Sequence, residues 1–451
     1  MIVADTIAAI STSVGEAAIS VVRLSGPESH AILGRAFLTR QPVSELSPRT
    51  TYLGRVVDAE KRVIDHALGI LYRAPASYTG EDMVELHCHG GVLVTQKVLG
   101  VLLSHGARQA DAGEFTQRAF LNGKMDLTQA EAVMDLIHAQ STLAMRAANE
   151  QLEGHIGKQA DEMRTGLIGI LAHVEAYIDF PDEDISPETG AALLARLDGL
   201  LNQTRKLLAT SEHGRLLRQG ARTVICGEPN VGKSSLLNLL AGFERAIVSP
   251  RAGTTRDTIE EFIQVHGIPL RLVDTAGLRE SDDDIEQSGI ERTTREMERA
   301  DLILEVVDAS QPADSSNRVV MTGQALQRRI LVLNKSDCGQ HPSWKRSGGY
   351  SISCQSGEGL EELRLAVRDL IARDGLLLGD HPIAINARHQ SCFEKVSDCL
   401  NAARTSLMSG VAPEFTALDL REAVQALGEV VGQIDGEEVL DQIFRQFCIG
   451  K

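Results

Sequence analysis

The stretch Gly227-Glu228-Pro229-Asn230-Val231-Gly232-Lys233-Ser234 has the pattern G-x-x-x-x-G-K-S of a phosphate-binding loop. The β-branched run 223–226 before it predicts a strand, and residues 235–240 after it predict the start of a helix. In this setting, backbone N–H groups of the loop and the helix N-terminus point at phosphate oxygens. We expect Lys233 to reach the β- and γ-phosphates and the Ser234 hydroxyl to bind Mg²⁺. The stretch therefore predicts an α/β domain that binds a nucleoside triphosphate.

Two further motifs are expected to complete the phosphate and Mg²⁺ site. Gly253-Thr254-Thr255-Arg256-Asp257 is a plausible first switch, in which the Thr255 hydroxyl completes the Mg²⁺ shell. Asp274-Thr275-Ala276-Gly277 follows an apolar strand, so that the Asp274 carboxylate can hold the second shell of Mg²⁺ and the Gly277 N–H can reach the γ-phosphate.

Two later motifs predict that the base is guanine. Asn334-Lys335-Ser336-Asp337 ends the apolar run 330–333. The Asp337 carboxylate can accept hydrogen bonds from N1–H and the 2-amino group of guanine, and adenine offers neither donor. Backbone N–H groups of Ser353-Cys354-Gln355 can contact guanine O6. Each motif is short, but five in order at strand ends predict a GTPase and disfavour an ATPase.

Leu278 follows the Asp-Thr-Ala-Gly motif, where Ras-like proteins have a glutamine that orients the attacking water. An apolar side chain cannot orient water, so another group must. The acidic run 280–286 supplies candidates, and its alternative interpretation is a solvated loop.

The composition is that of a soluble, multidomain protein. A chain of 451 residues predicts about two to four domains, and no apolar run or N-terminal pattern indicates a membrane span or signal peptide. Seven scattered cysteines without a C-x-x-C pair indicate reduced thiols in a cytoplasm. The net charge of −17 excludes a general nucleic-acid binder, so action on RNA requires a local basic face or a second protein that holds the RNA.

Hydrophobic patterns divide the chain into four segments. We expect an α+β unit at 1–122, a helical segment at 123–219, a parallel α/β domain at 220–374 and a second helical segment at 375–451. Within the first unit, strands are expected at 17–24, 53–57, 67–72 and 83–87, and a helix at 92–103. We interpret the α/β domain as an insertion between helical segments that pack together; two independent helical domains are the alternative.

Stretches outside the nucleotide motifs resemble the MnmE/TrmE family of tRNA-modification GTPases. They are Asp5-Thr6-Ile7-Ala8-Ala9, Tyr78-Thr79-Gly80-Glu81-Asp82, Gly113-Glu114-Phe115, Arg118-Ala119-Phe120-Leu121-Asn122, Asp179-Phe180-Pro181-Asp182-Glu183 and Phe447-Cys448-Ile449-Gly450-Lys451. Because they run from one terminus to the other, the resemblance covers essentially the whole chain. It implies a folate-binding N-terminal domain, a discontinuous helical domain and an inserted Ras-like α/β P-loop G domain.

The resemblance implies a reaction and partners. The family hydrolyses GTP with K⁺ stimulation when its G domains dimerise around K⁺. With a flavin-dependent (FAD) partner protein, in a heterotetramer or larger complex, it adds an aminomethyl-type or carboxymethylaminomethyl group to C5 of the wobble uridine of certain tRNAs. 5,10-Methylene-tetrahydrofolate, for which 5-formyl-tetrahydrofolate is an analogue, donates the carbon, and glycine or ammonia donates the nitrogen. The N-terminal domains form the homodimer.

The resemblance also implies site residues. Asn230 is implied as a side-chain K⁺ ligand, and Glu286 as the acid that positions water in place of Leu278. Ser249, Arg251 and Thr254 are implied as further K⁺ ligands, and Arg23, Glu85, Lys124 and Lys451 as folate contacts. The nucleotide site is then expected to comprise Asn230, Val231, Gly232, Lys233, Ser234, Ser235, Ser249, Pro250, Arg251, Ala252, Gly253, Thr254, Thr255, Asp274, Thr275, Ala276, Gly277, Asn334, Lys335, Ser336, Asp337, Ser353, Cys354 and Gln355.

Cys448, four residues from the end, has two interpretations. It is a candidate nucleophile toward a pyrimidine ring or the one-carbon unit, but its apolar neighbours equally suit a packing role. Gly450 and Lys451 fit a lipidation box poorly.

A protein of a different class is the competing hypothesis. A GTP-gated assembly factor for ribosomes or other ribonucleoproteins would share the nucleotide motifs and modify nothing. Such factors usually carry a recognisable RNA-binding module, and no such module is evident in this sequence.

Overall fold

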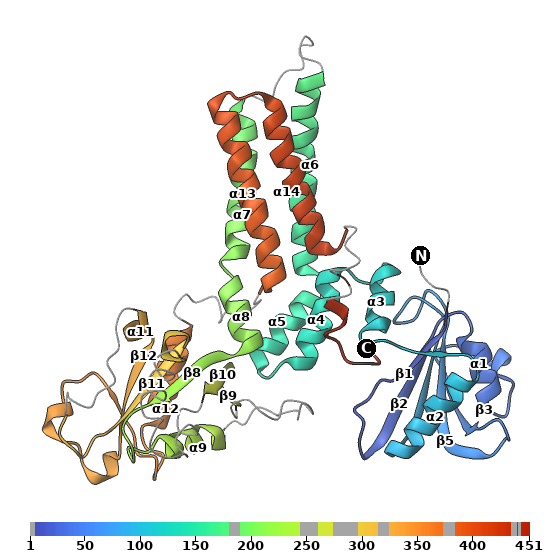
Figure 1. The fold of residues 1–451 in the computed structure, drawn as a ribbon, viewed down its shortest axis with the longest axis horizontal. Helices are drawn as coiled ribbons and strands as arrows, with labels where there is room; N and C mark the ends of the chain where they lie inside the picture. Colours follow the sequence, from blue (N-terminus) through green and yellow to red (C-terminus); the bar gives the residue numbers. More distant parts are fainter. Residues whose placement is uncertain are drawn as a thin grey trace, which may run out of the picture. The chain divides into compact units, whose positions relative to one another are not determined.

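The computed structural model describes residues 5–179, 190–243, 260–273, 296–313, 324–372, 384–433, 440 and 443–451. Contacts group the chain into two compact units, whose elements are labelled in Figure 1. The first unit comprises Met1–Met134 with Val431–Lys451, and the second comprises Asp135–Val430. The domain boundaries expected from the sequence remain predictions.

The first unit is built on a sheet with the strand order β3-β4-β5-β6-β2-β1-β7. Neighbouring strands are antiparallel, except that β7 runs parallel to β1. The strands are β1 (Ile7–Ile10), β2 (Ala17–Ser25), β3 (Phe37–Leu38), β4 (Thr51–Val57), β5 (Val63–Tyr72), β6 (Met83–Gly90) and β7 (Arg108–Gln109). Strands β2, β4, β5 and β6 confirm the four strands that the short apolar runs predict.

Helices α1 and α2 cover one face of this sheet, and α3 covers part of the other face. The helices of the unit are α1 (Ser29–Ala36), α2 (Val92–Ser104), α3 (Glu114–Leu121) and the first part of α4 (Leu127–His138). Leu33 of α1 and Leu102 of α2 share a buried core with Val22 of β2, so these two helices lie against the same face (Figure 1). On the opposite face, Phe115 of α3 packs with Ala9 of β1.

The C-terminal segment packs against this first unit. Phe444 and Phe447 are buried together with Leu127 of α4. Ile449 then forms an antiparallel bridge with Ala112, just before α3. The last residues of the chain are therefore held beside the turn that begins α3.

Asp126 and Gln129 have the three-residue spacing of a capping box, and the start of α4 shows one. The Asp126 Oδ1 accepts from the Gln129 N–H at 2.9 Å, and the Gln129 Oε1 accepts from the Asp126 N–H at 2.9 Å. Because both end groups are satisfied reciprocally, α4 has a defined beginning.

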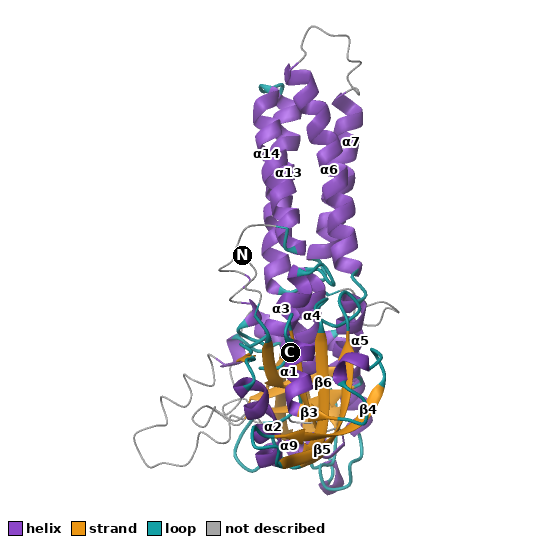
Figure 2. Ribbon diagram, turned by 90° about the vertical axis from the view of Figure 1, so that its right-hand side faces the viewer, coloured by secondary structure: helices purple, strands orange, loops and turns teal. Residues whose placement is uncertain are grey.

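Outside the inserted domain, the described helices of the second unit include α5 (Thr142–Leu152), α6 (His155–Asp179), α7 (Gly190–Leu208), α8 (Ser211–Gln219), α13 (Ala387–Ser409) and α14 (Pro413–Val431). Helices α6, α7, α13 and α14 run side by side as a long bundle (Figure 2). The Arg404 Nε contacts the Asp198 Oδ1 at 2.7 Å, joining α13 to α7, and Arg421 of α14 pairs with Glu175 of α6. Helices from both ends of the unit thus pack together, as expected if the α/β domain is an insertion.

The inserted domain has a sheet of described strands in the order β13-β12-β11-β8-β10-β9. All neighbours are parallel except the β9–β10 pair. The strands are β8 (Ala221–Cys226), β9 (Glu260–Val265), β10 (Ile268–Val273), β11 (Leu302–Asp308), β12 (Arg329–Asn334) and β13 (Tyr350–Ser351), and the helices are α9 (Lys233–Phe243), α11 (Gln324–Gln327) and α12 (Leu360–Ile371). This confirms the α/β fold and the strand before the phosphate loop. Among the described residues, no helix combines the length and apolar character needed to cross a membrane.

Candidate functional site

The phosphate loop connects the end of β8 to the start of α9, as the motif predicts. Gly232 has φ +101°, a conformation that L side chains rarely adopt. A Cβ on Gly232 would also lie 2.2 Å from the Asn334 Nδ2. Because of these two constraints, the second glycine of the motif cannot be replaced without shifting the loop.

Asn334 joins three of the predicted motifs. Its Nδ2 donates to the Val231 carbonyl in the phosphate loop at 2.7 Å, and its Oδ1 accepts from the Cys354 N–H at 3.1 Å. The side chain is buried, with 2% of its surface exposed. Asn334 thereby fixes the phosphate loop against the loop that is expected to contact guanine O6.

Asp337 lies one turn beyond Asn334 and remains exposed. The buried Ser353 hydroxyl donates to its carboxylate and lowers the pKa of Asp337 below the ordinary value. Ser336 donates its backbone N–H to the Ile352 carbonyl at 3.0 Å, which holds the two loops together. An ionised, oriented carboxylate at this place can accept two hydrogen bonds from guanine.

Lys335 supports the same loop from its other side. Its backbone is left-handed, with φ +65°, and its Nζ binds the Asp308 Oδ2 at 2.7 Å. Hydrogen bonds from Lys335 and Ser310 outweigh burial, so the pKa of Asp308 is lowered. This ion pair ties the 334–337 loop to the end of β11.

Lys233 and the two serines after it stand at the start of α9. The Lys233 Nζ donates to the carbonyls of Gly227 at 3.1 Å and Glu228 at 2.6 Å, so its ammonium group lies over the loop. Ser234 and Ser235 are exposed. A backbone cradle, an ammonium group and an exposed hydroxyl at a helix N-terminus fit a polyphosphate with Mg²⁺.

Several predicted residues lie outside the described residues. They are Ser249, Pro250, Arg251, Ala252, Gly253, Thr254, Thr255, Asp274, Thr275, Ala276, Gly277 and Glu286. The described hairpin of β9 and β10 runs between the two switch segments in sequence, because β9 begins at Glu260 and β10 ends at Val273.

A second group of predicted residues meets on the first unit's sheet. Register pairs Arg23 of β2 with Glu85 of β6, and the Arg23 Nη2 lies 2.8 Å from the Glu85 Oε1. The Arg23 guanidinium lies over the rings of Tyr78, at 5.3 Å, and Phe115, at 5.7 Å. This arrangement combines a carboxylate, a cation and aromatic surfaces, which suits a flat heterocycle with amino groups.

Sequence reasoning missed Tyr72 in this group, since no local signal distinguishes it from other strand residues. The Tyr72 hydroxyl donates to the Glu85 Oε2 at 3.4 Å, and burial together with the Glu85 charge raises the pKa of Tyr72. Lys124, a predicted folate contact, donates its Nζ to the Pro75 carbonyl at 3.0 Å. Lys124 therefore lies against the loop that carries Tyr78.

The predicted tail residues lie near the same turn. The Gly113 N–H donates to the Cys448 carbonyl at 3.4 Å, and the Lys451 N–H donates to the same carbonyl at 3.3 Å. The Cys448 thiol is exposed, whereas burial raises the pKa of Cys88 and of Cys226 to about 12. Because α3 begins directly after Gly113, the turn that holds the tail also carries the Phe115 ring beneath Arg23.

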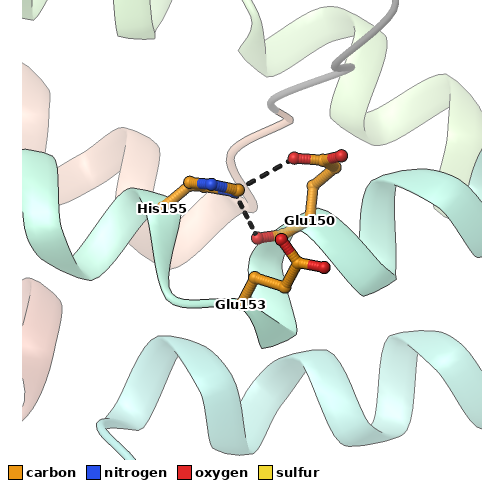
Figure 3. Close-up of side chains that lie close together, drawn as sticks. All are labelled: Glu150, Glu153 and His155. Atoms are coloured by element: carbon orange, nitrogen blue, oxygen red, sulfur yellow. Dashed lines mark hydrogen bonds and ion pairs between the residues drawn. The ribbon is translucent and has the colours of Figure 1, made fainter.

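Glu150, Glu153 and His155 form a cluster at the α5–α6 turn that the sequence analysis did not single out (Figure 3). The His155 Nδ1 lies 3.0 Å from both the Glu150 carbonyl and the Glu150 Oε2. Glu153 is exposed. The imidazole nitrogen is already used by Glu150, so we interpret the cluster as a clamp on the turn between two helices.

Two family models match this chain. The model described as "GTP-binding protein TrmE N-terminus" matches residues 6–124, and the model described as "MnmE helical domain" matches residues 127–448. A protein named tRNA modification GTPase MnmE from Akkermansia muciniphila is 53% identical over 454 residues, which cover 99% of each chain. Proteins of the same name from Opitutus terrae and Natranaerobius thermophilus are 43% and 41% identical, again over 99% of each chain.

Proposed function

The chain belongs to the MnmE family of tRNA modification GTPases, and from this premise we propose the finer chemistry of its reaction. It is a GTP hydrolase that acts in tRNA modification. With a flavin-dependent partner, it adds an aminomethyl-type or carboxymethylaminomethyl group to C5 of the wobble uridine. 5,10-Methylene-tetrahydrofolate is the proposed carbon donor.

The nucleotide part of this proposal rests above all on Asn334. Its amide fixes the phosphate loop to the Cys354 loop, so that the phosphates and the base are bound by one rigid assembly. Lys233 orients the β- and γ-phosphates, and Asp337 selects guanine. Mg²⁺ on Ser234 and Thr255 would neutralise developing charge on the phosphates.

We assign K⁺ to Asn230, Ser249, Arg251 and Thr254, and the positioning of water to Glu286. Asn230 is exposed on the phosphate loop and has φ +63°. This position is compatible with a side chain that binds a cation beside the phosphates. A cation there would supply the positive charge that other GTPases take from an arginine finger.

The folate part rests on the pair of Arg23 and Glu85. The Glu85 Oε1 is bound by Arg23. The Oε2 receives a longer hydrogen bond from Tyr72, at 3.4 Å, and lies 3.6 Å from the His87 Nε2, so it keeps room to accept from a pterin amino group. Lys124 and the terminal Lys451 would bind the glutamate tail of folate through their charges. Cys448 is exposed on the tail and is our candidate nucleophile toward the one-carbon unit.

A homodimer through the first unit is supported by its open sheet face. Leu53 is 70% exposed, Ile19 57% and Leu68 38%. Strand register places Leu53 opposite Leu68 and Leu68 opposite His87. Large apolar side chains that share one sheet face mark an interaction surface. We also propose a cytoplasmic location, because all seven cysteines are free thiols.

GTP hydrolysis in KCl against NaCl at equal ionic strength tests this proposal. We expect stimulation by K⁺ that is lost in Asn230→Ala and retained in Asn202→Ala, a matched change at an exposed position on α7. Equal hydrolysis rates in both salts for the wild type would contradict the K⁺ mechanism. The proposed role of Glu286 in positioning water would then also lose its support.

A further inference from the structure

Helix α8 is bound to the inserted domain by a charged contact. The Arg215 Nη2 lies 2.6 Å from the Asp301 Oδ1, and its Nη1 lies 3.3 Å from the Oδ2. The same Oδ2 accepts from the Arg222 N–H at 2.8 Å, at the start of the strand that leads to the phosphate loop. Arg215 therefore fixes α8 to the base of the nucleotide site's central strand.

Apolar packing makes this side of α8 continuous with the domain core. Leu216 and Leu217 are 6% and 4% exposed and share a core with Ile225 of β8 and Leu272 of β10. Close-packed interiors do not deform continuously. Helix α8 thus has to move with β8 and β10, the strands that precede the phosphate loop and the second switch.

The other side of α8 contacts the helical domain through Arg218. Its Nε lies 3.4 Å from the Asp135 Oδ2 on α4, and its Nη2 donates to the Ala384 carbonyl at 3.0 Å. Nearby, a Cβ on Gly214 would lie 2.2 Å from the Ile385 carbonyl oxygen. Residues 384–386 lead directly into α13, so α8 touches both α4 and the start of the returning helix.

A cavity separates Arg218 from part of this core, since Leu217 and Ala144 belong to the core and also line the cavity. A cavity of about 140 Å³ lies between α4, α5 and α8, lined by Asp135, Ala144, Ala148, Gln151, Leu217 and Arg218 among others. The Arg218 Nη1 is buried and has no hydrogen-bond partner among the described residues. A cavity of this size, beside an unsatisfied donor, gives Arg218 room for a second arrangement.

We propose that α8 transmits the nucleotide state of the G domain to the helical domain, with Arg215 and Arg218 as its two positioning residues. Arg215 holds α8 to the P-loop strand. Arg218 passes the displacement of α8 to Asp135 on α4 and to the segment that begins α13. The cavity is the space in which this displacement occurs. The proposal requires GTP binding only and stands apart from the folate and flavin chemistry.

Hydrogen exchange of the full chain tests it, with and without a non-hydrolysable GTP analogue in the presence of Mg²⁺ and K⁺. In the wild type we expect the analogue to change exchange at least about fivefold in the peptide around Asp135 and in residues 384–386. Arg218→Gln should abolish this change. Arg404→Gln, which breaks an arginine–aspartate pair between α7 and α13, should retain it.

Ala148→Leu separates transmission from stability. The added carbons fill the cavity, so this variant should be at least as stable as the wild type, whereas Arg218→Gln should be less stable. Both are expected to lose the nucleotide-dependent change while binding the analogue as the wild type does. Wild-type exchange that is insensitive to the analogue in α4, or an unchanged response in both variants, would overturn the proposal.

Discussion

At the scale of single residues, the proposed guanine site contains one supporting residue, Asn334, and one residue proposed to recognise the base, Asp337. Asn334 is buried, and its side-chain amide forms hydrogen bonds with two backbone groups. Asp337 is exposed, and the Ser353 hydroxyl orients its carboxylate. Because the hydrogen bond holds the pKa of Asp337 low, its carboxylate is ionised throughout the neutral range. In our proposal, recognition of the base then depends on the charge of the Asp337 side chain.

Replacing that carboxylate with an amide should change the preferred base. Asp337→Asn should weaken GTP binding about 100-fold, since the charged acceptor for two guanine hydrogen bonds is lost. The affinity for xanthosine triphosphate should rise, because its 2-carbonyl can accept a hydrogen bond from the new amide. Titration with fluorescent analogues of GTP and of xanthosine triphosphate measures the change. Asp369→Asn, at an exposed position of α12, is the matched control. An unaltered preference for GTP would refute the assignment.

Glu114 contributes a pH-dependent part of the stability of the first unit. Burial raises its pKa, but hydrogen bonds from Arg108, the Asp111 N–H and Arg118 outweigh burial and lower it overall. A carboxyl group whose pKa is lower in the folded protein than in the unfolded chain stabilises the fold. This stabilisation is complete above the pKa in the unfolded chain, about 4.3, and is lost as the pH falls through the lower pKa in the folded protein.

Thermal unfolding between pH 3 and pH 7 should therefore show Tm falling below about pH 4.3. Glu114→Gln should lower the neutral-pH stability by about 1–3 kcal/mol and flatten this acid dependence, because nearly buried Arg118 loses a charged partner. Glu60→Gln, at an exposed turn, should leave the curve unchanged. A variant as acid-sensitive as the wild type would rule out this role for Glu114.

At the scale of elements, the C-terminal tail depends on two aromatic anchors. Phe444 and Phe447 contact each other with tilted rings, whose centroids are 5.3 Å apart, and are buried against α4. The residues beyond them, Cys448 to Lys451, are held by backbone contacts to the turn before α3. Removing an anchor should therefore release the tail.

Phe447→Ala is expected to cost about 3–5 kcal/mol of local stability, as for other buried aromatic residues. Carboxypeptidase release of Lys451 should become faster, and the exposed Cys448 thiol should be alkylated faster. Phe415→Ala, an exposed aromatic on α14, is the control. Tail release at the wild-type rate would show that the aromatic pair does not anchor it.

Much of the element pattern was predictable from the sequence, because it is local. Apolar runs predict β2, β4, β5, β6 and β8, and the Asp126–Gln129 spacing predicts the start of α4. Contacts between residues that lie far apart in the sequence were not predictable. Arg215 and Asp301 are 86 residues apart, and only the fold brings them together.

The candidate site divides in the same way. Chemistry predicts Lys233, Ser234 and Asp337, because their motifs are contiguous. Arg23 and Glu85 were expected only through family resemblance, since strand register alone places them opposite each other. Tyr72 carries no signal at all, because its contact to Glu85 depends on how neighbouring strands align.

At the scale of the whole molecule, the inserted G domain is held at both of its ends. Its entry passes through α8, and its exit passes the Arg218 contact at Ala384 before α13 begins. The chain carries a net charge of −17, which opposes tight, unaided binding of RNA. This charge fits our proposal that GTP hydrolysis controls the modification reaction and that a second protein helps to bind the tRNA.

The most direct test is transfer of labelled carbon to tRNA. Purified protein, its flavin-dependent partner and ¹³C-methylene-tetrahydrofolate are incubated with unmodified tRNA and either GTP or GDP, and the nucleosides are measured by mass spectrometry. We predict heavy carbon in the C5 substituent of the wobble uridine with GTP and little with GDP. GTP turnover without any label in the nucleoside, or equal labelling with GDP, would contradict the coupling of hydrolysis to modification.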